Sequence, residues 1–376
     1  MQGQTRRALL GAGASALIAA PAFAQSNSRR NTTYERAIVI DALGGPGGAD
    51  PANTDPNAPL SARDIADVRA SGVTAVNLTV SSVGNDPNAF EQTLAAIAYA
   101  ERELDNHPDI FMKIRTGADL QVAKRTGRLG LIYGFQDTYL LGTNLDRVPM
   151  FANFGLRISQ LTYNKRNLAG DGCLEPDNAG LSAFGRSLVE AFNHNKILVD
   201  GSHGGAQTIL DGIAASSAPT AITHTGCRAL VDVPRNVSDD VLRALAQKGG
   251  VVGIYFMPFI RARGQATSAD LIAHLEHAIN VAGEDHVGLG TDGSISAQAT
   301  DAAALERQHQ FVDARRQAGI AAPGEDRDVF NIVTEYNQPR RFELLANDLQ
   351  TRGHSARRIE KILGGNFARL FADVWG

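Results

Sequence analysis

Short apolar runs alternate along the chain with longer amphipathic stretches. Eight runs have the length and the β-branched content of strands, and they lie at residues 37–40, 75–80, 129–133, 156–161, 197–200, 220–224, 251–255 and 287–291. Stretches of helical periodicity lie between most of them, at residues 62–70, 90–106, 185–193, 206–215, 239–248 and 268–282. Strands that alternate with helices predict a parallel sheet with helical crossovers.

The number and spacing of these strands favour a closed barrel. Eight β segments over about 260 residues fit a (β/α)8 TIM-type barrel that forms a single domain. An open, doubly wound sheet has the same alternation and stays the alternative. Residues 44–60, rich in Gly, Pro, Asp and Asn, predict a long loop after the first strand, and residues 320–341 predict an irregular excursion before the final helices.

Residues 1–24 have the pattern of a cleavable export signal. Arg6 and Arg7 precede an apolar stretch at residues 8–20, and small residues at 22–24 fit a cleavage site. Paired arginines followed by Ala-Leu-Leu resemble a twin-arginine signal, with a Sec signal as the alternative. The apolar stretch is short and rich in Ala and Gly, so it does not predict a membrane span.

Composition and the signal together suggest an exported globular protein. The chain is 43% hydrophobic and 20% charged with a formal net charge of -4, which is ordinary for a globular chain and gives no basic surface for nucleic acid. We expect a polar segment at residues 25–36, a barrel domain at 37–376 and a periplasmic location. Cys173 and Cys227 could pair in an oxidising compartment, but the sequence does not show that they meet.

Polar and imidazole side chains follow the predicted strands, at the end where a barrel carries its chemistry. They are Gln136, Asp137, Tyr163, Asn164, His203, His224 and Asp292. Imidazoles on adjacent strands can converge on one cation, so His203 and His224 are candidate zinc ligands. Asp292 is placed to accept a proton from water that a metal activates. For a single strand-end histidine, a hydrogen-bonded core residue is the alternative.

Several segments in one order resemble the membrane (renal) dipeptidase family, within the amidohydrolase-type barrels. They are LTYNKRN, GLSAFGRSLVEAFN, LVDGSH, AITHTG, PRNVSDDVLRALAQKGGVVGI, VGLGTDG and ILGGNFARLF. The resemblance runs from about residue 37 to residue 375. It implies a zinc-dependent dipeptidase whose metal-binding histidines are His203 and His224.

The resemblance also implies roles for other residues. Asp292 matches the aspartate that handles the proton. Arg235 and Asn236 match the pair associated with the substrate carboxylate or the developing oxyanion, and a guanidinium suits a carboxylate because it donates two parallel hydrogen bonds. Apart from the resemblance, Tyr163 is a candidate for substrate binding, because its hydroxyl could donate a hydrogen bond to an oxyanion; an ordinary buried tyrosine is the alternative.

The chain departs from the family pattern at four places. Leu43, Gly44 and Gly45 replace a His-x-Asp motif, Gln136 replaces the bridging glutamate, Tyr163 replaces a histidine, and Ser294 replaces an aspartate. These changes remove ligands and negative charge that would hold two dications ~3.5–4 Å apart. We therefore expect one zinc ion, bound by His203, His224 and the Gln136 carbonyl, with Asp137 as a possible replacement for Gln136.

The sequence thus predicts a metallohydrolase that cleaves a dipeptide or a related amide. Two alternatives stay open: a non-hydrolytic binding protein that keeps the barrel, and a different reaction on a carboxylate-bearing small molecule. The expected partner is the small-molecule substrate, with a homodimer left open. Three other histidines, His274, His277 and His286, lie mid-helix or before a strand, where we expect structural roles.

Overall fold

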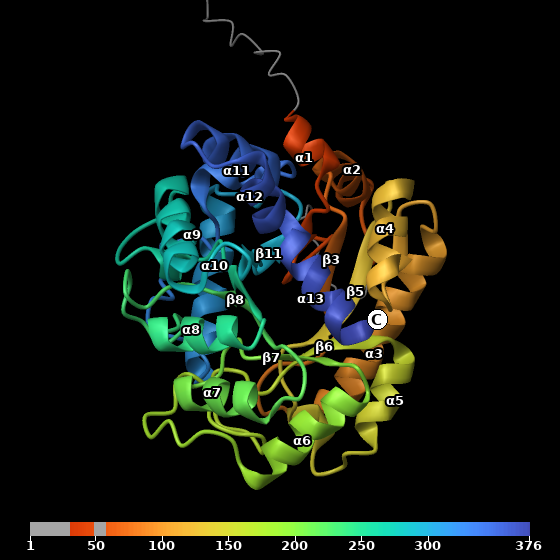
Figure 1. The fold of residues 1–376 in the computed structure, drawn as a ribbon, viewed down its shortest axis with the longest axis vertical. Coiled ribbons are helices and arrows are strands. Elements are labelled where there is room, and N and C mark those ends of the chain that lie inside the picture. The colour runs from red at the N-terminus through yellow and green to blue at the C-terminus, as the bar shows by residue number, and fades with distance from the viewer. Residues whose placement is uncertain (1–30, 49–57) are drawn as a thin grey trace, which may run out of the picture. The chain divides into compact units, whose positions relative to one another are not determined.

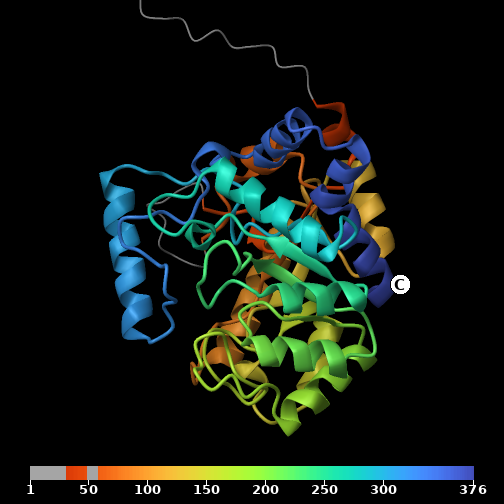
Figure 2. The same cartoon turned by 60° about the vertical axis from the view of Figure 1, so that its left-hand side comes forward.

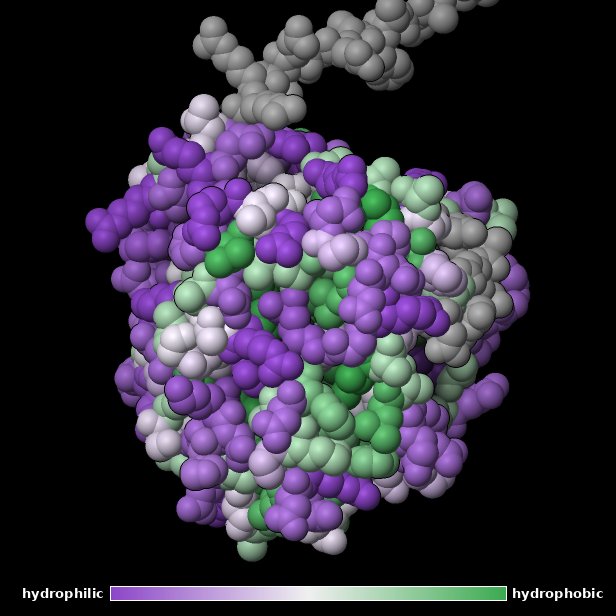
Figure 3. Space-filling model, turned by 90° about the vertical axis from the view of Figure 1, so that its right-hand side faces the viewer, coloured by the Kyte–Doolittle hydropathy of each residue, from purple (hydrophilic) through white to green (hydrophobic). Residues whose placement is uncertain are grey.

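The computed structural model describes residues 31–48 and 58–376. The predicted signal at residues 1–24, residues 25–30 of the polar segment and residues 49–57 of the predicted loop lie outside the described residues. No helix in the described part of the chain is long and apolar enough to cross a membrane. The side seen in Figure 3 is mainly hydrophilic, with hydrophobic side chains in small groups.

Eight parallel strands form the barrel that the alternation predicted. In order of hydrogen bonding they are β1 (Ile40–Asp41), β3 (Ala75–Thr79), β5 (Leu129–Phe135), β6 (Leu156–Gln160), β7 (Leu198–Asp200), β8 (Ala221–Thr225), β9 (Val251–Ile254) and β10 (Val287–Leu289). The backbone N–H of Ala42 donates to the carbonyl of Leu289 at 2.9 Å, which joins the first strand to the last. The sheet is therefore closed, and the open doubly wound alternative is excluded.

Helices surround the barrel (Figure 1). The six predicted ones are α2 (Ala62–Ser71), α3 (Ala89–Asn106), α6 (Ala183–His194), α7 (Ala206–Ala215), α8 (Asp239–Gln247) and α9 (Ser268–Ala282). The others are α1 (Thr32–Arg36), α4 (Gly117–Thr126), α5 (Arg147–Phe154), α10 (Ala302–Gln317), α11 (Arg341–Thr351), α12 (Ala356–Glu360) and α13 (Asn366–Trp375). A short additional strand, β4 (Phe111–Lys113), pairs with the start of β5; three residues are too few for periodicity to reveal.

The C-terminal helix α13 closes the end of the barrel where the strands begin, and Figure 1 shows it lying across the ring. Phe367, Phe371 and Trp375 pack with first residues of the strands, such as Ala75. A Cβ at Gly288 would lie 2.6 Å from the Phe367 ring, so glycine is required for this close approach. The functional site is therefore expected at the opposite end of the barrel, where the strands finish.

Helix α10 stands apart from the ring of helices, as Figure 2 shows. It follows a two-residue strand, β11 (Gly293–Ser294), which pairs with β2 (Gly44–Gly45) just beyond β1. The predicted irregular excursion at residues 320–341 is confirmed, because its one complete regular element is a 3-10 turn at Thr334–Tyr336. Its first residue, Ile320, accepts a hydrogen bond from Asn164, which follows β6.

Candidate metal and substrate site

The two candidate metal-binding histidines are neighbours at the strand ends. His224 lies within β8, and His203 follows β7 in the left-handed region, at φ 63°. Their ring centroids are 4.9 Å apart, and both residues are buried. A left-handed non-glycine residue is uncommon and is maintained only where its surroundings enforce it.

The tautomer of His203 follows from its partner, Asn164. The Asn164 amide nitrogen donates to the Ile320 carbonyl at 2.7 Å, so its oxygen faces His203. That oxygen is 2.6 Å from His203 Nδ1 and accepts its proton. The Nε2 atom of His203 therefore carries a lone pair.

His224 is fixed in the same way by Thr223. The Thr223 hydroxyl donates to Asp200 at 2.5 Å, which leaves its oxygen to accept from His224 Nδ1 at 2.9 Å. Asp200 also accepts from the backbone N–H groups of Ser202 and Thr223 and from the Ser202 hydroxyl. Burial raises the pKa of Asp200 above its usual value, although these hydrogen bonds act in the opposite direction. The Nε2 atom of His224 is left with its lone pair.

Both Nε2 atoms are buried without a hydrogen-bond partner among the described residues. A buried polar atom without a partner costs free energy unless something binds it. Burial, together with the nearby Arg235 charge, holds the pKa of both histidines well below the usual value, so both stay neutral. A neutral imidazole whose other nitrogen is hydrogen bonded is the usual form of a metal-ligating histidine, so this pair fits one zinc ion.

A third strong ligand is missing in the part of the chain that the structure describes, since no three His, Cys, Asp or Glu side chains gather there in a metal-binding group. The Gln136 amide nitrogen donates to the Thr79 hydroxyl at 2.8 Å, which leaves its carbonyl oxygen as the possible donor to a metal. Asp137 accepts from Gly84, Tyr139 and Asn167, so its carboxylate holds loops together. The donor set present does not fit a second metal.

At the end of β1, a buried carboxylate closes the barrel. Asp41 accepts hydrogen bonds from the backbone N–H of Thr291 at 2.7 Å and from its hydroxyl at 2.6 Å. Burial raises the pKa of Asp41 to about 7, against these hydrogen bonds. Leu43, which follows β1, is also buried.

Asp292 follows β10 and is also in the left-handed region, at φ 56°. It is half-buried, and its backbone N–H donates to the Leu43 carbonyl at 2.8 Å. Burial raises the pKa of its carboxyl to about 6, whereas Arg235 and Arg315 lower it. A carboxylate with a pKa in this range can accept and return a proton near neutral pH.

Arg235 and Asn236 differ in what they can offer a ligand. Arg235 is buried, and its Nη2 atom has no partner among the described residues. Asn236 donates both amide N–H groups, to the Val231 and Phe259 carbonyls. Arg235 thus has a free donor for a carboxylate, whereas the Asn236 side chain mainly secures its loop.

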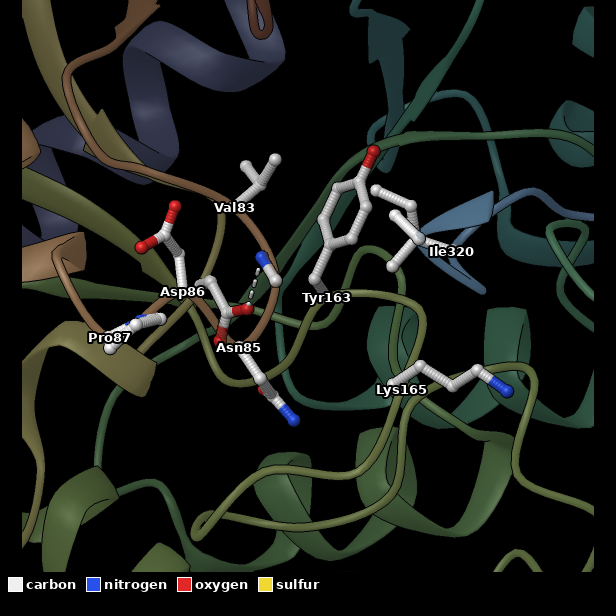
Figure 4. Close-up of a pocket in the computed structure, with 10 residues that line it drawn as sticks. Val83, Asn85, Asp86, Pro87, Tyr163, Lys165 and Ile320 are labelled. Atoms are coloured by element: carbon white, nitrogen blue, oxygen red, sulfur yellow. Dashed lines mark hydrogen bonds between the residues drawn. The ribbon is translucent and has the colours of Figure 1, made fainter. Parts of the chain in front are cut away.

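Tyr163 lies between the histidines and a cavity. Its ring stacks on that of His203, with centroids 4.2 Å apart and an interplanar angle of 24°. Tyr163 also lines a cavity of about 440 Å³, together with Val83, Gly84, Asn85, Asp86, Pro87, Asp137, Lys165, Ala318 and Ile320. Figure 4 shows the 83–87 segment facing Tyr163 and Ile320 across this space. A volume of this size suits a small ligand.

Two site residues were missed by sequence reasoning. Cys173 donates its thiol to the Asn164 amide oxygen at 3.3 Å and lies beside Arg235. Both cysteines are free thiols, so the disulfide considered for Cys173 and Cys227 is absent. Arg315, on α10, donates to the Tyr163 hydroxyl at 3.0 Å. Neither residue follows a strand, and no motif surrounds them, so the sequence carried no signal for them.

His274, His277 and His286 have structural partners, as expected. His274 is buried and accepts from the backbone N–H of Cys227. His277 contacts Asp239 at 2.8 Å, and His286 donates to the Gly250 carbonyl at 2.8 Å. None of these imidazoles joins His203 and His224.

Comparison with protein families matches residues 42–306 to the membrane dipeptidase family, peptidase family M19. Dipeptidase tcpJ of Claviceps purpurea is 30% identical over 290 residues, which are 76% of this chain and 60% of that protein. Dipeptidase ataJ of Aspergillus terreus is 26% identical over 310 residues, or 76% and 67% of the two chains. The matched part of the chain thus spans about 60% of the first of these relatives.

Solved structures agree with this match. An amidohydrolase from Pseudomonas aeruginosa is 30% identical, with a TM-score of 0.78 over 92% of this chain and 98% of that one. A metallopeptidase from Rhodobacter sphaeroides, liganded with a phosphinate mimic of the dipeptide L-Ala-D-Ala, has a TM-score of 0.71 over 90% and 100%. At 20% identity the second structure supports the fold alone.

Proposed function

Because this chain belongs to the membrane dipeptidase family, peptidase family M19, we propose that it is a metallohydrolase that cleaves a dipeptide or a related amide with one zinc ion. The observation that carries this proposal is the pair of buried Nε2 atoms on His203 and His224. Both lone pairs have no partner, and hydrogen bonds on Nδ1 hold both in the ligating tautomer. Gln136 is the proposed third ligand, through its side-chain carbonyl.

Residues of the chain itself then have separate roles in the reaction. A zinc ion held by this pair would supply water of lowered pKa as the nucleophile. Asp292 accepts the proton of the attacking water and returns it to the amide nitrogen as the C–N bond breaks, so that protons balance. Arg235 donates its free N–H group to the substrate carboxylate. Tyr163 contacts the substrate at the mouth of the 440 Å³ cavity.

Metal content of the purified full-length protein tests this proposal. We expect about one equivalent of zinc, lost in His203→Ala and in His224→Ala, together with hydrolysis of dipeptides. His309→Ala is the matched control, because His309 lies on α10 and contacts Asp328 instead. A folded wild-type protein that contains no zinc and hydrolyses no dipeptide would contradict the proposal.

The missing third carboxylate, histidine or cysteine favours a second candidate, a barrel that binds a carboxylate-bearing small molecule without hydrolysing it. This protein would bind a dipeptide through Arg235 and contain no zinc. Calorimetry with dipeptides and N-acyl amino acids, run beside the hydrolysis assay, separates the two and also reveals a different reaction. The twin-arginine export signal and the periplasmic location remain parts of the proposal, and a homodimer is left open.

A further inference from the structure

Helix α10 contributes a charged residue to the site from outside the barrel. The Arg315 guanidinium makes two hydrogen bonds to the Glu325 carboxylate, from Nε at 2.6 Å and from Nη2 at 2.8 Å. The side chains of both residues are largely buried, with 15% and 6% exposed. A paired, bidentate guanidinium is held in one orientation. Its remaining nitrogen, Nη1, donates to the Tyr163 hydroxyl oxygen at 3.0 Å.

The same segment is fastened to the site at a second point. The Ile320 carbonyl accepts from Arg315 Nη2 at 3.3 Å and from the Asn164 amide nitrogen at 2.7 Å. Asn164 is the residue that orients His203. Helix α10 therefore contacts Tyr163 through Arg315, and the first residue of the excursion, Ile320, contacts Asn164, the partner of His203.

The contact from Arg315 decides what Tyr163 can do. Because the phenol oxygen accepts from a guanidinium, the phenol proton is left for another acceptor. A tyrosine phenol keeps its proton at neutral pH, so this proton is available for donation. Figure 4 shows Tyr163 beside Ile320, with its hydroxyl pointing away from Lys165.

We propose that Arg315, held by Glu325, is a positioning residue that aims the Tyr163 hydroxyl at the oxyanion formed from the scissile carbonyl. This inference rests on the proposed function, whose tetrahedral species carries that negative oxygen. When water adds to the carbonyl carbon, the C=O π bond becomes an oxyanion, and Tyr163 donates a hydrogen bond to it without losing its proton. When the C–N bond breaks, the carbonyl reforms and Tyr163 is unchanged.

A phosphinate mimic of a dipeptide tests this role, because its tetrahedral, anionic group resembles the oxyanion. We expect Arg315→Gln and Tyr163→Phe each to raise the Kd of the phosphinate about tenfold or more, and the double variant to lose no more than the larger single effect. The affinity or KM for the planar dipeptide should change less than about twofold. Arg315→Lys should be intermediate, since an ammonium can reach Tyr163 but cannot pair with Glu325 in two places.

Arg327→Gln is the matched control. It removes a guanidinium nearby in the chain, whose ion-pair partner is Asp313 at 3.4 Å, and it should bind the phosphinate like the wild type. If Arg315→Gln does not fold, Glu325→Gln keeps the side-chain shape, loosens the guanidinium and should weaken phosphinate binding in the same selective way.

The outcomes separate this role from the proposed function. A wild-type protein that hydrolyses no dipeptide but binds phosphinate through Arg315 overturns the proposed function and leaves the positioning in place. Unchanged phosphinate affinity in Arg315→Gln overturns the positioning, whatever the activity. Equal losses for phosphinate and dipeptide, additive losses in the double variant, or no phosphinate binding by the wild type also overturn it.

Discussion

Gly45 and Ser294 lie directly opposite each other in the parallel pair of β2 and β11. The Ser294 hydroxyl donates to the Gly47 carbonyl, and the N–H of Ile295 donates to the Gly45 carbonyl at 2.8 Å. Aspartates would occupy both positions in the pattern that the sequence resembles. Two facing carboxylates repel each other without a cation between them. Without the first metal, facing aspartates at these two positions would repel each other. Glycine and serine at these positions remove that repulsion.

Gly45 should accept an aspartate, and Gly44 should not accept even a methyl group. A Cβ at Gly45 would meet Leu78 at 3.6 Å, an ordinary contact, whereas at Gly44 it would lie 2.5 Å from an Asp41 oxygen and 2.9 Å from the Gly293 carbonyl. We expect Gly44→Ala to lower the free energy of unfolding by about 1–3 kcal/mol. Gly45→Asp should change it by less than about 1 kcal/mol. Urea denaturation measures both, and equal losses would contradict this account.

Restoring the replaced ligands should restore a second metal. The variant Leu43→His with Gly45→Asp and Gln136→Glu supplies an imidazole and two carboxylates at the end of β1 and after β5. We expect zinc content to rise from about one to about two equivalents, since catalytic metals are held by such ligands. Leu43→His alone lacks the carboxylates and serves as the control. A triple variant that folds and still holds one equivalent would mean that other residues also prevent the second site.

The Thr223 hydroxyl should control zinc affinity through its hydrogen bond with His224 Nδ1. Thr223→Val removes the acceptor for His224 Nδ1, so the ring is free to take the other tautomer. We expect zinc affinity to fall about 10–100-fold, the usual effect of losing such a partner. Thr220→Val is the control just before the same strand, because its buried hydroxyl has no partner among the described residues. Competition with a zinc chelator measures both variants.

The barrel was readable from the sequence because each of its strands is a separate apolar run. Val251 to Ile254, for example, are all buried, and a buried parallel strand needs apolar residues on both faces. Helix α4 was not predicted, since only Leu120 and Ala123 of its ten residues are buried. Too few apolar positions recur there to give a helical period.

The site was predictable only where chemistry follows a strand. His203, His224 and Asp292 could be proposed because strand ends mark the functional face of a barrel. Arg315 lies 152 positions from Tyr163, and Ile320 lies 156 from Asn164. Contacts over such separations depend on how the excursion packs, and local patterns do not encode that.

Activity should depend on pH through Asp292. Burial raises the pKa of its carboxyl to about 6, and a general base must be ionised. The kcat/KM should therefore rise with pH through about 6 and level off above it, with about a tenth of the plateau value left at pH 5. Asp292→Asn should be slow and should lack this limb. A limb that persists in Asp292→Asn would assign the titration to another group.

Gln136 is the remaining test of the metal site, because only its carbonyl oxygen can serve as a ligand. In Gln136→Glu the Thr79 hydroxyl can donate to the new carboxylate, so the contact that the amide makes at 2.8 Å need not be lost. A carboxylate binds zinc more strongly than a neutral amide, and we expect zinc affinity to rise about tenfold or more. Gln136→Met keeps the size without the oxygen, and it should lower the affinity. Competition with a zinc chelator measures the zinc affinity of both variants. If neither substitution changes that affinity, His203 and His224 are the ligands that the protein itself supplies, and water completes the coordination shell.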